Sequence, residues 1–168
     1  MTFDPIAYFK TIAEKHILIQ HNDATNLAFF REFDTSSMLF DNSDFLAKMR
    51  KVAKTALVVQ FNEDGGVKGS SIDNKFRYKD GAVYLIKKVK VTDYNEIEAA
   101  RKEMSSIWDD IYSKLQTDIR TFKIPQLFDL DVSIKSIGML ADSFYGIAIF
   151  MSYSENYCYK FKPDNWLQ

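Results

Sequence analysis

Cysteine is almost absent from this sequence, since Cys158 is the only one among 168 residues. A single cysteine cannot form an intramolecular disulfide, which argues against a disulfide-stabilised secreted domain and indicates a reducing, cytoplasmic compartment. Histidine is nearly as scarce, with only His16 and His21. A nucleophilic Cys158 would need one of them as its base, yet both lie near the opposite end of the sequence.

The surroundings of the cysteine favour a structural interpretation. In residues 155–161 (ENYCYKF) a strand would place Tyr157, Tyr159 and Phe161 on one face and Cys158, a small hydrophobe, on the other. If the tyrosines face outward beside Trp166, they form an aromatic contact surface at the end of the chain. If they face inward, they close the core.

Motifs for metal, phosphate or acyl chemistry are also missing. Two histidines and one cysteine without motif spacing are a weak zinc set, and the glycines fit neither phosphate-loop pattern. No G-x-S-x-G elbow occurs. Asp129 and Asp131 form a D-x-D that can hold a divalent cation from one strand face, but a solvated face explains them equally well. We therefore predict a protein that is not an enzyme, with no catalytic residues, metal or cofactor.

Long apolar runs and a net charge are lacking as well. No run approaches the roughly 18 residues of a membrane span, and the N-terminus (MTFDPIAYFK) has no basic cluster, so we expect neither signal peptide nor anchor. With 22 basic and 23 acidic side chains, no overall field attracts nucleic acid or membranes. The 46% of hydrophobic residues instead indicates one globular domain, residues 1–168.

The first half of the chain predicts helices and then a strand. Asp4-Pro5 starts a helix over residues 5–20. Residues 27–33 (LAFFREF) fit a helix or a buried strand, and the whole segment 23–45 stays unassigned. Residues 42–44 cap a short second helix, whose apolar positions are Phe45, Leu46, Met49, Val52 and Ala53. Residues 55–61 (TALVVQF) predict a strand that ends in a turn at 62–66.

The second half predicts a hairpin, a long helix and further strands. Residues 75–78 and 82–91 alternate as two strands around a turn at 79–81. Asp93 begins a helix over residues 93–122, with Glu96 completing a capping box. The helix carries Glu98–Lys102 and Asp110–Lys114 as i,i+4 pairs, and Pro125 stops it. Strands follow at residues 128–135 and 144–154, and residues 156–161 continue the second of these or form a further strand.

This order defines an α+β fold class: an antiparallel sheet of about four to six strands packed on one long amphipathic helix, with one or two N-terminal helices.

The charge distribution is uneven along the chain. Residues 68–90 carry seven basic and two acidic side chains, whereas the following helix is rich in acid. Such a basic hairpin can bind a nucleic-acid backbone, or dock on the acidic helix of a neighbouring copy, or simply protect an edge strand with lysines. The possible interaction surface comprises Lys75, Arg77, Tyr84, Lys87, Lys88, Lys90, Tyr157, Tyr159 and Trp166.

A leading helix, two strands, one long amphipathic helix and two more strands resemble the small neck, tail-terminator and tail-completion proteins of tailed bacteriophages. The resemblance covers residues 55–154 and is one of topology and size. It implies a ring-forming structural subunit without catalysis, located in the cytoplasm or in an assembled virion. We predict a non-enzymatic assembly protein that associates with itself or with other assembly proteins and not with membranes. The alternative is a nucleic-acid-associated accessory protein that binds through the hairpin at 75–90.

Overall fold

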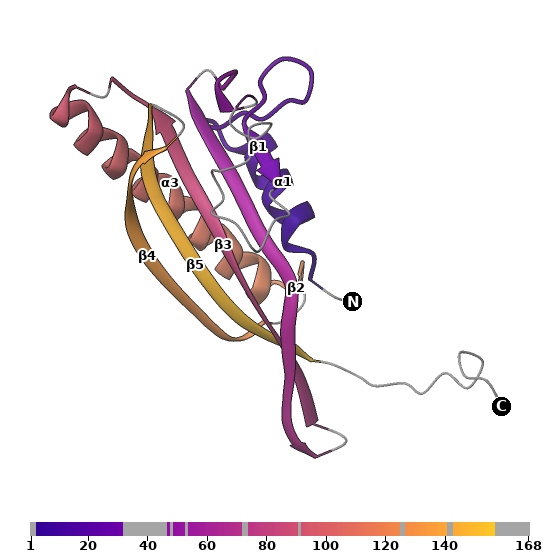
Figure 1. Cartoon of the computed structure of the whole chain (residues 1–168). Helices are drawn as coiled ribbons and strands as arrows, with labels where there is room; N and C mark the ends of the chain where they lie inside the picture. Colours follow the sequence, from indigo (N-terminus) through magenta and orange to yellow (C-terminus); the bar gives the residue numbers. More distant parts are fainter. Residues whose placement is uncertain are drawn as a thin grey trace.

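The protein folds as a five-stranded sheet with its two long helices on one face (Figure 1). The computed structural model describes residues 3–31, 47, 49–52, 54–71, 74–90, 92–124, 127–140 and 143–156. The elements are α1 (Pro5–Lys15), β1 (Phe29–Arg31), β2 (Thr55–Ser71), β3 (Asn74–Lys88), α3 (Tyr94–Arg120), β4 (Phe128–Leu140) and β5 (Phe144–Asn156). This arrangement confirms the predicted α+β class.

The strands lie in the order β1-β2-β3-β5-β4. All neighbours pair antiparallel except β1, which runs parallel to β2, so the sheet is mixed. Residues 27–33, which fit a helix or a buried strand, contribute the short strand β1, where Phe29 and Phe30 are both buried. Strand β5 lies in the interior of the sheet, as its apolar sequence predicts, and β4 forms an outer edge.

The predicted turns at 62–66 and 79–81 are wrong. Strands β2 and β3 run through both segments as one long hairpin whose last pair is Ser71 with Asn74, and an irregularity in β2 lies between Phe61 and Gly65. Gly81 pairs with Phe61 inside the sheet, where a Cβ on the glycine would lie 2.1 Å from the Phe61 ring. This glycine makes room for an aromatic ring and does not turn the chain.

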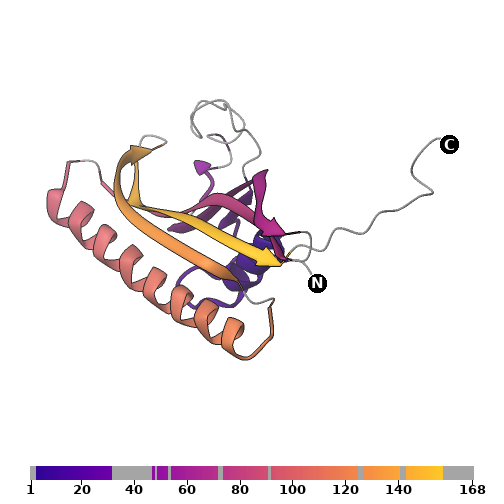
Figure 2. The same cartoon turned by 90° about the horizontal axis from the view of Figure 1, so that it is seen from below.

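The main core lies between the sheet and the two helices. Helix α3 packs on β5 and β3, whereas α1 packs on β2 and β1. Figure 2 shows the long helix α3 below the sheet. Apolar side chains from both helices and from alternate strand positions form one cluster, which includes Phe9, Leu57, Leu85, Met104 and Ile149. Helix α3 buries the apolar residues that recur at helical spacing on one side, from Ile97 to Leu115, whereas Phe122, at the predicted end of the helix, is 81% exposed.

The opposite face of the sheet has a smaller cluster. Phe30, Met49 and Val52 cover Val58 and Ala82 there. Most of the predicted second helix, including Phe45, Leu46 and Ala53, lies outside the described residues, as does the strand predicted after Asn156. Met49 and Val52 are nevertheless buried, as their spacing predicts.

Both long helices differ from prediction near their ends. Helix α1 ends at Lys15 because His16 is extended and caps it, so the predicted continuation to residue 20 is wrong. Helix α3 begins at the predicted cap, with the Asp93 side chain accepting from the N–H groups of Asn95 and Glu96. It ends at Arg120, before Phe122, whose φ of 55° is incompatible with a right-handed helix.

The ion pairs on α3 also differ from the predicted ones. Glu98 pairs with Arg101 at 3.5 Å, and Lys114 pairs with Asp118 one turn further along. The capping box is half formed, because Glu96 Oε2 accepts from the Lys90 N–H at 3.1 Å and not from that of Asp93.

Candidate functional site

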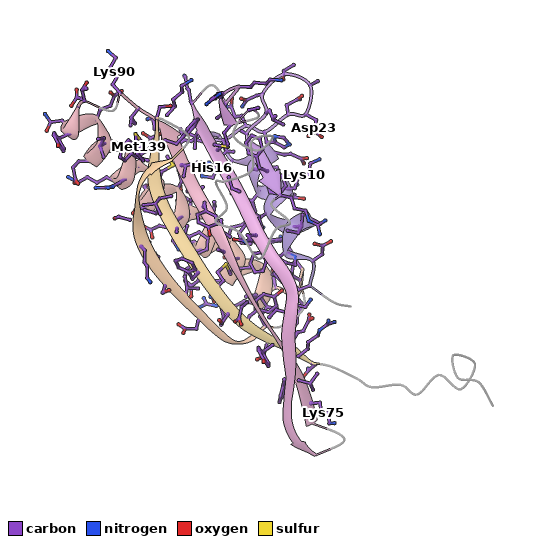
Figure 3. The ribbon with its side chains drawn as sticks, in the orientation of Figure 1. Lys10, His16, Asp23, Lys75, Lys90 and Met139 are labelled. Carbon is purple, nitrogen blue, oxygen red and sulfur yellow. The ribbon has the colours of Figure 1, made fainter. Side chains whose placement is uncertain are left out.

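The basic residues of the predicted interaction surface do not form one patch. Lys75 lies near the tip of the β2–β3 hairpin and Lys90 at the opposite end of the sheet (Figure 3). Lys75 and Lys87 are 12 strand residues apart on β3, which corresponds to about 40 Å at roughly 3.3 Å per residue. Lys88 also points to the opposite face from Lys87, because neighbouring strand residues alternate. A single stretch of backbone phosphates cannot contact all of them on one surface.

Lys87 is engaged within its own chain. Its Nζ lies 2.5 Å from Glu103 Oε2 on α3, and the two side chains are 31% and 34% exposed. The hairpin is basic and the helix is acidic, and this contrast suggested docking between copies. The Lys87–Glu103 pair shows that part of this opposite charge is paired within one chain.

Tyr84 belongs to the core and not to the surface, so its assignment to an interaction surface is wrong. Its side chain is 9% exposed within the smaller cluster, and its hydroxyl donates to Gln60 Oε1 at 3.3 Å. Burial raises the pKa of the Tyr84 hydroxyl. Tyr157, Tyr159 and Trp166 lie outside the described residues.

Strand β4 is the outer strand on one side of the sheet and is open along most of its length. Among the described residues, no strand pairs with the side of β4 that faces away from β5. Helix α3 packs on β5 and β3, so the helix layer leaves β4 largely uncovered. The positions from 133 to 136 are exposed on both faces of the sheet. An uncovered edge of this kind presents unpaired N–H and C=O groups that a further strand can bind.

Apolar side chains accompany this open edge. Ile134 and Met139 on β4 are 49% and 55% exposed, and Phe150 on the neighbouring β5 is 40% exposed. The ammonium of Lys135 lies 5.4 Å from the centre of the Phe150 ring. The sequence predicts a strand over residues 128–135 but does not indicate that this strand lies at an edge. Its position in the sheet depends on pairing with strands that are distant in the sequence.

One end of the edge is covered by α3. Arg101 donates to the Ile137 carbonyl at 3.4 Å, close to the irregularity between Ile137 and Leu140. A Cβ added at Gly138 would meet no atom within 4 Å, so the space on that side of the residue is open. Between Asp131 and Ile137 the pairing with β5 is regular, and this segment is the available part of the edge.

A second feature is a pocket of about 290 Å³ between α1 and α3. The carboxylate of Asp118 lies there, 4% exposed, where it accepts from the Tyr8 hydroxyl at 3.1 Å and pairs with Lys114. His16 Nε2 lies 3.8 Å from Asp110 Oδ2 in the same pocket. These two polar contacts join the helices, which gives them a structural explanation.

The Tyr8–Asp118 contact predicts a weakening of the fold at alkaline pH. Burial first, and then the charge of Asp118 and the hydrogen bond to it, raise the pKa of Tyr8. The unfolded chain releases this proton near pH 10, whereas the folded protein retains it to higher pH. The stabilisation is therefore complete below about pH 10 and falls by up to about 1.4 kcal/mol per unit above it.

Tyr8→Phe should flatten this alkaline slope in urea unfolding followed by circular dichroism. Tyr94→Phe is the matched control, because Tyr94 is 85% exposed and its hydroxyl meets water in both states. Equal slopes for the wild type and Tyr8→Phe would contradict the assignment.

The other candidate residues are dispersed. His21 is buried, and its Nδ1 accepts from the N–H groups of Ala28 and Phe29 at 3.2 Å each, which anchors the start of β1. Within the described part of the chain, no three His, Cys, Asp or Glu side chains gather as metal ligands would. Asp131 is exposed on β4, while Cys158 and the Asp129 side chain lie outside the description.

In comparisons with known proteins, no family model, curated protein or solved structure matches this chain. Among the described residues, none of the helices has the length and apolar content needed to cross a membrane.

Proposed function

We propose that this protein is a non-enzymatic assembly protein that associates through the outer edge of β4. The observation that carries the proposal is the 13-residue edge strand β4, which lies largely outside the area covered by the helices and exposes Ile134 and Met139. Natural sheets usually protect such an edge with proline, several charges or a covering element. The available segment from Asp131 to Ile137 contains no proline and two charged residues.

A structural subunit of the kind found in phage necks and tails is the class we propose. The support is the order of elements, with α1, the short β1, the strand pair β2 and β3, the long α3 and the strand pair β4 and β5. This support is an analogy of fold. The proposed partners are further copies of the chain or other assembly proteins.

The proposal is tested by light scattering coupled to size-exclusion chromatography over a wide range of protein concentrations. Ile134→Lys puts a charge at the open edge, where the half-exposed side chain can reach water without disturbing the core. We expect the dissociation constant to rise at least about tenfold, because the charge must be desolvated when another strand pairs there.

Ile17→Lys is the matched control. It makes the same change at a residue that is 76% exposed but lies in the turn after α1. This variant should associate like the wild type. A wild-type protein that stays monomeric at every concentration and binds no other assembly protein encoded beside it would overturn the proposal.

A further inference from the structure

We propose that the β4 edge binds the β4 edge of a second copy, antiparallel, about a two-fold axis that passes beside Ser133. This inference rests on the proposed function and specifies both the partner and the register. Residues equidistant from Ser133 on the two copies would lie directly opposite each other.

Charge complementarity selects this register. About an axis at Ser133, Asp131 of each copy faces Lys135 of the other, so two opposite-charge pairs form across one interface. All three residues are exposed and share one face of β4. Moving the axis by one residue places Asp131 opposite Ser133 or Ile137 instead. Directly opposed charges of opposite sign stabilise paired strands, whereas like charges in those positions destabilise them.

The apolar residues agree with the same register. Val132 of one copy would face Ile134 of the other, on the side of the sheet that carries the helices. Val132 already packs against the main core, and Ile134 is 49% exposed. Pairing would extend the core across the interface and remove the exposed Ile134 from water.

The backbone geometry permits the contact. In this register every residue pairs with a residue that is an even number of positions away in the sequence. The N–H and C=O groups that point out of the edge alternate along each strand, so those of the two copies lie opposite each other. Asp131 to Lys135 lies within the regular part of β4, beyond the Arg101 contact at Ile137. Because α3 packs on β5 and β3, the second copy can approach the edge. The two sheets would then be continuous, with the helices of both copies on the same face.

Disulfide trapping tests the position of the axis. In a Cys158→Ser background, Ser133→Cys places one thiol from each copy directly opposite the other, with Cβ atoms about 4.5–5.5 Å apart. That spacing is near the range a disulfide requires. Mild oxidation of the full-length protein should give a cross-linked dimer on a denaturing gel.

Ser136→Cys in the same background is the matched control. Position 136 is exposed on the same strand, but the two thiols would lie about 20 Å apart along the paired strands. We expect it to cross-link at least about tenfold more slowly, since those thiols meet only by random collision.

A charge exchange tests the pairing independently. Asp131→Lys and Lys135→Asp each place like charges opposite one another twice, and each should weaken the dimer about tenfold. The double variant restores opposite charges and should return the dissociation constant to within about threefold of wild type. Circular dichroism confirms that each variant is folded.

The outcomes separate the two proposals. If the wild type associates and Ile134→Lys prevents it, but Ser133→Cys cross-links no faster than Ser136→Cys, this register is overturned and edge association stands. A double charge variant no better than the single ones would also overturn the register. A strictly monomeric wild type without partners overturns both proposals.

Discussion

Gly146→Ala should lose about 3 kcal/mol or more of the free energy of unfolding. Gly146 lies on β5 between Ile86 of β3 and Ile137 of β4, inside the sheet. A Cβ at this position would lie 2.0 Å from the Leu85 carbonyl oxygen and 2.9 Å from the Ile86 Cα. These are backbone atoms that are held by strand pairing, so no side-chain rotation relieves the overlap. The strands must separate and lose hydrogen bonds, or the variant does not fold.

Gly138→Ala is the matched control, because a Cβ there meets no atom within 4 Å. Its stability should stay within about 0.5 kcal/mol of wild type. Urea unfolding at one fixed protein concentration measures both variants, since stability depends on concentration in a protein that associates. A Gly146→Ala variant as stable as Gly138→Ala would show that β3 and β5 do not approach each other this closely.

Glu155→Ala should cost about 3–5 kcal/mol, the range found when one partner of a buried ion pair is removed. Glu155 is 3% exposed near the end of β5. Its Oε1 lies 3.1 Å from Lys79 Nζ, and its Oε2 accepts from the Phe3 N–H at 3.1 Å. Alanine would leave a largely buried ammonium without its anion and a buried N–H without its acceptor. The contact joins the two ends of the described chain, so its loss should loosen both.

Two further variants separate the charge from the hydrogen bond. Glu155→Gln keeps an oxygen for the Phe3 N–H but removes the negative charge that Lys79 faces. Combining it with Lys79→Met removes the unpaired positive charge as well. The double variant should therefore recover at least about half of the loss caused by Glu155→Gln alone. Equal losses for the single and the double variant would show that Lys79 and Glu155 do not interact.

The open edge follows from how two long helices are distributed over five strands. Helix α1 covers β1 and β2, and α3 crosses β3 and β5. Strand β4 lies at the margin of this layer. Among the described residues it is held by its pairing with β5, by side chains such as Val132 and by the Arg101 hydrogen bond to the Ile137 carbonyl. Its exposed apolar residues, Ile134 and Met139, would lose contact with water if a further strand paired there.

Much of the fold could be predicted from local patterns. The α3 stripe of Ala100, Met104, Trp108 and Leu115 recurs at helical spacing and is buried. Asp93 caps this helix where its side chain predicts. The apolar run of β5 lies inside the sheet, as expected for a strand covered on both faces. Each of these features depends on residues close together in the sequence, so the sequence alone determines them.

Tertiary contacts decided the rest. Gly81 looked like a turn residue because glycine tolerates positive φ, yet a partner 20 positions earlier, Phe61, makes it a packing site. Tyr84 looked like part of a basic, aromatic surface, but the cluster with Phe30 and Met49 buries it. The open edge of β4 could not be predicted either, because it also depends on contacts between residues far apart in the sequence. A strand's sequence sets its two faces, whereas strands far along the chain determine which neighbours pair with it and which side remains free.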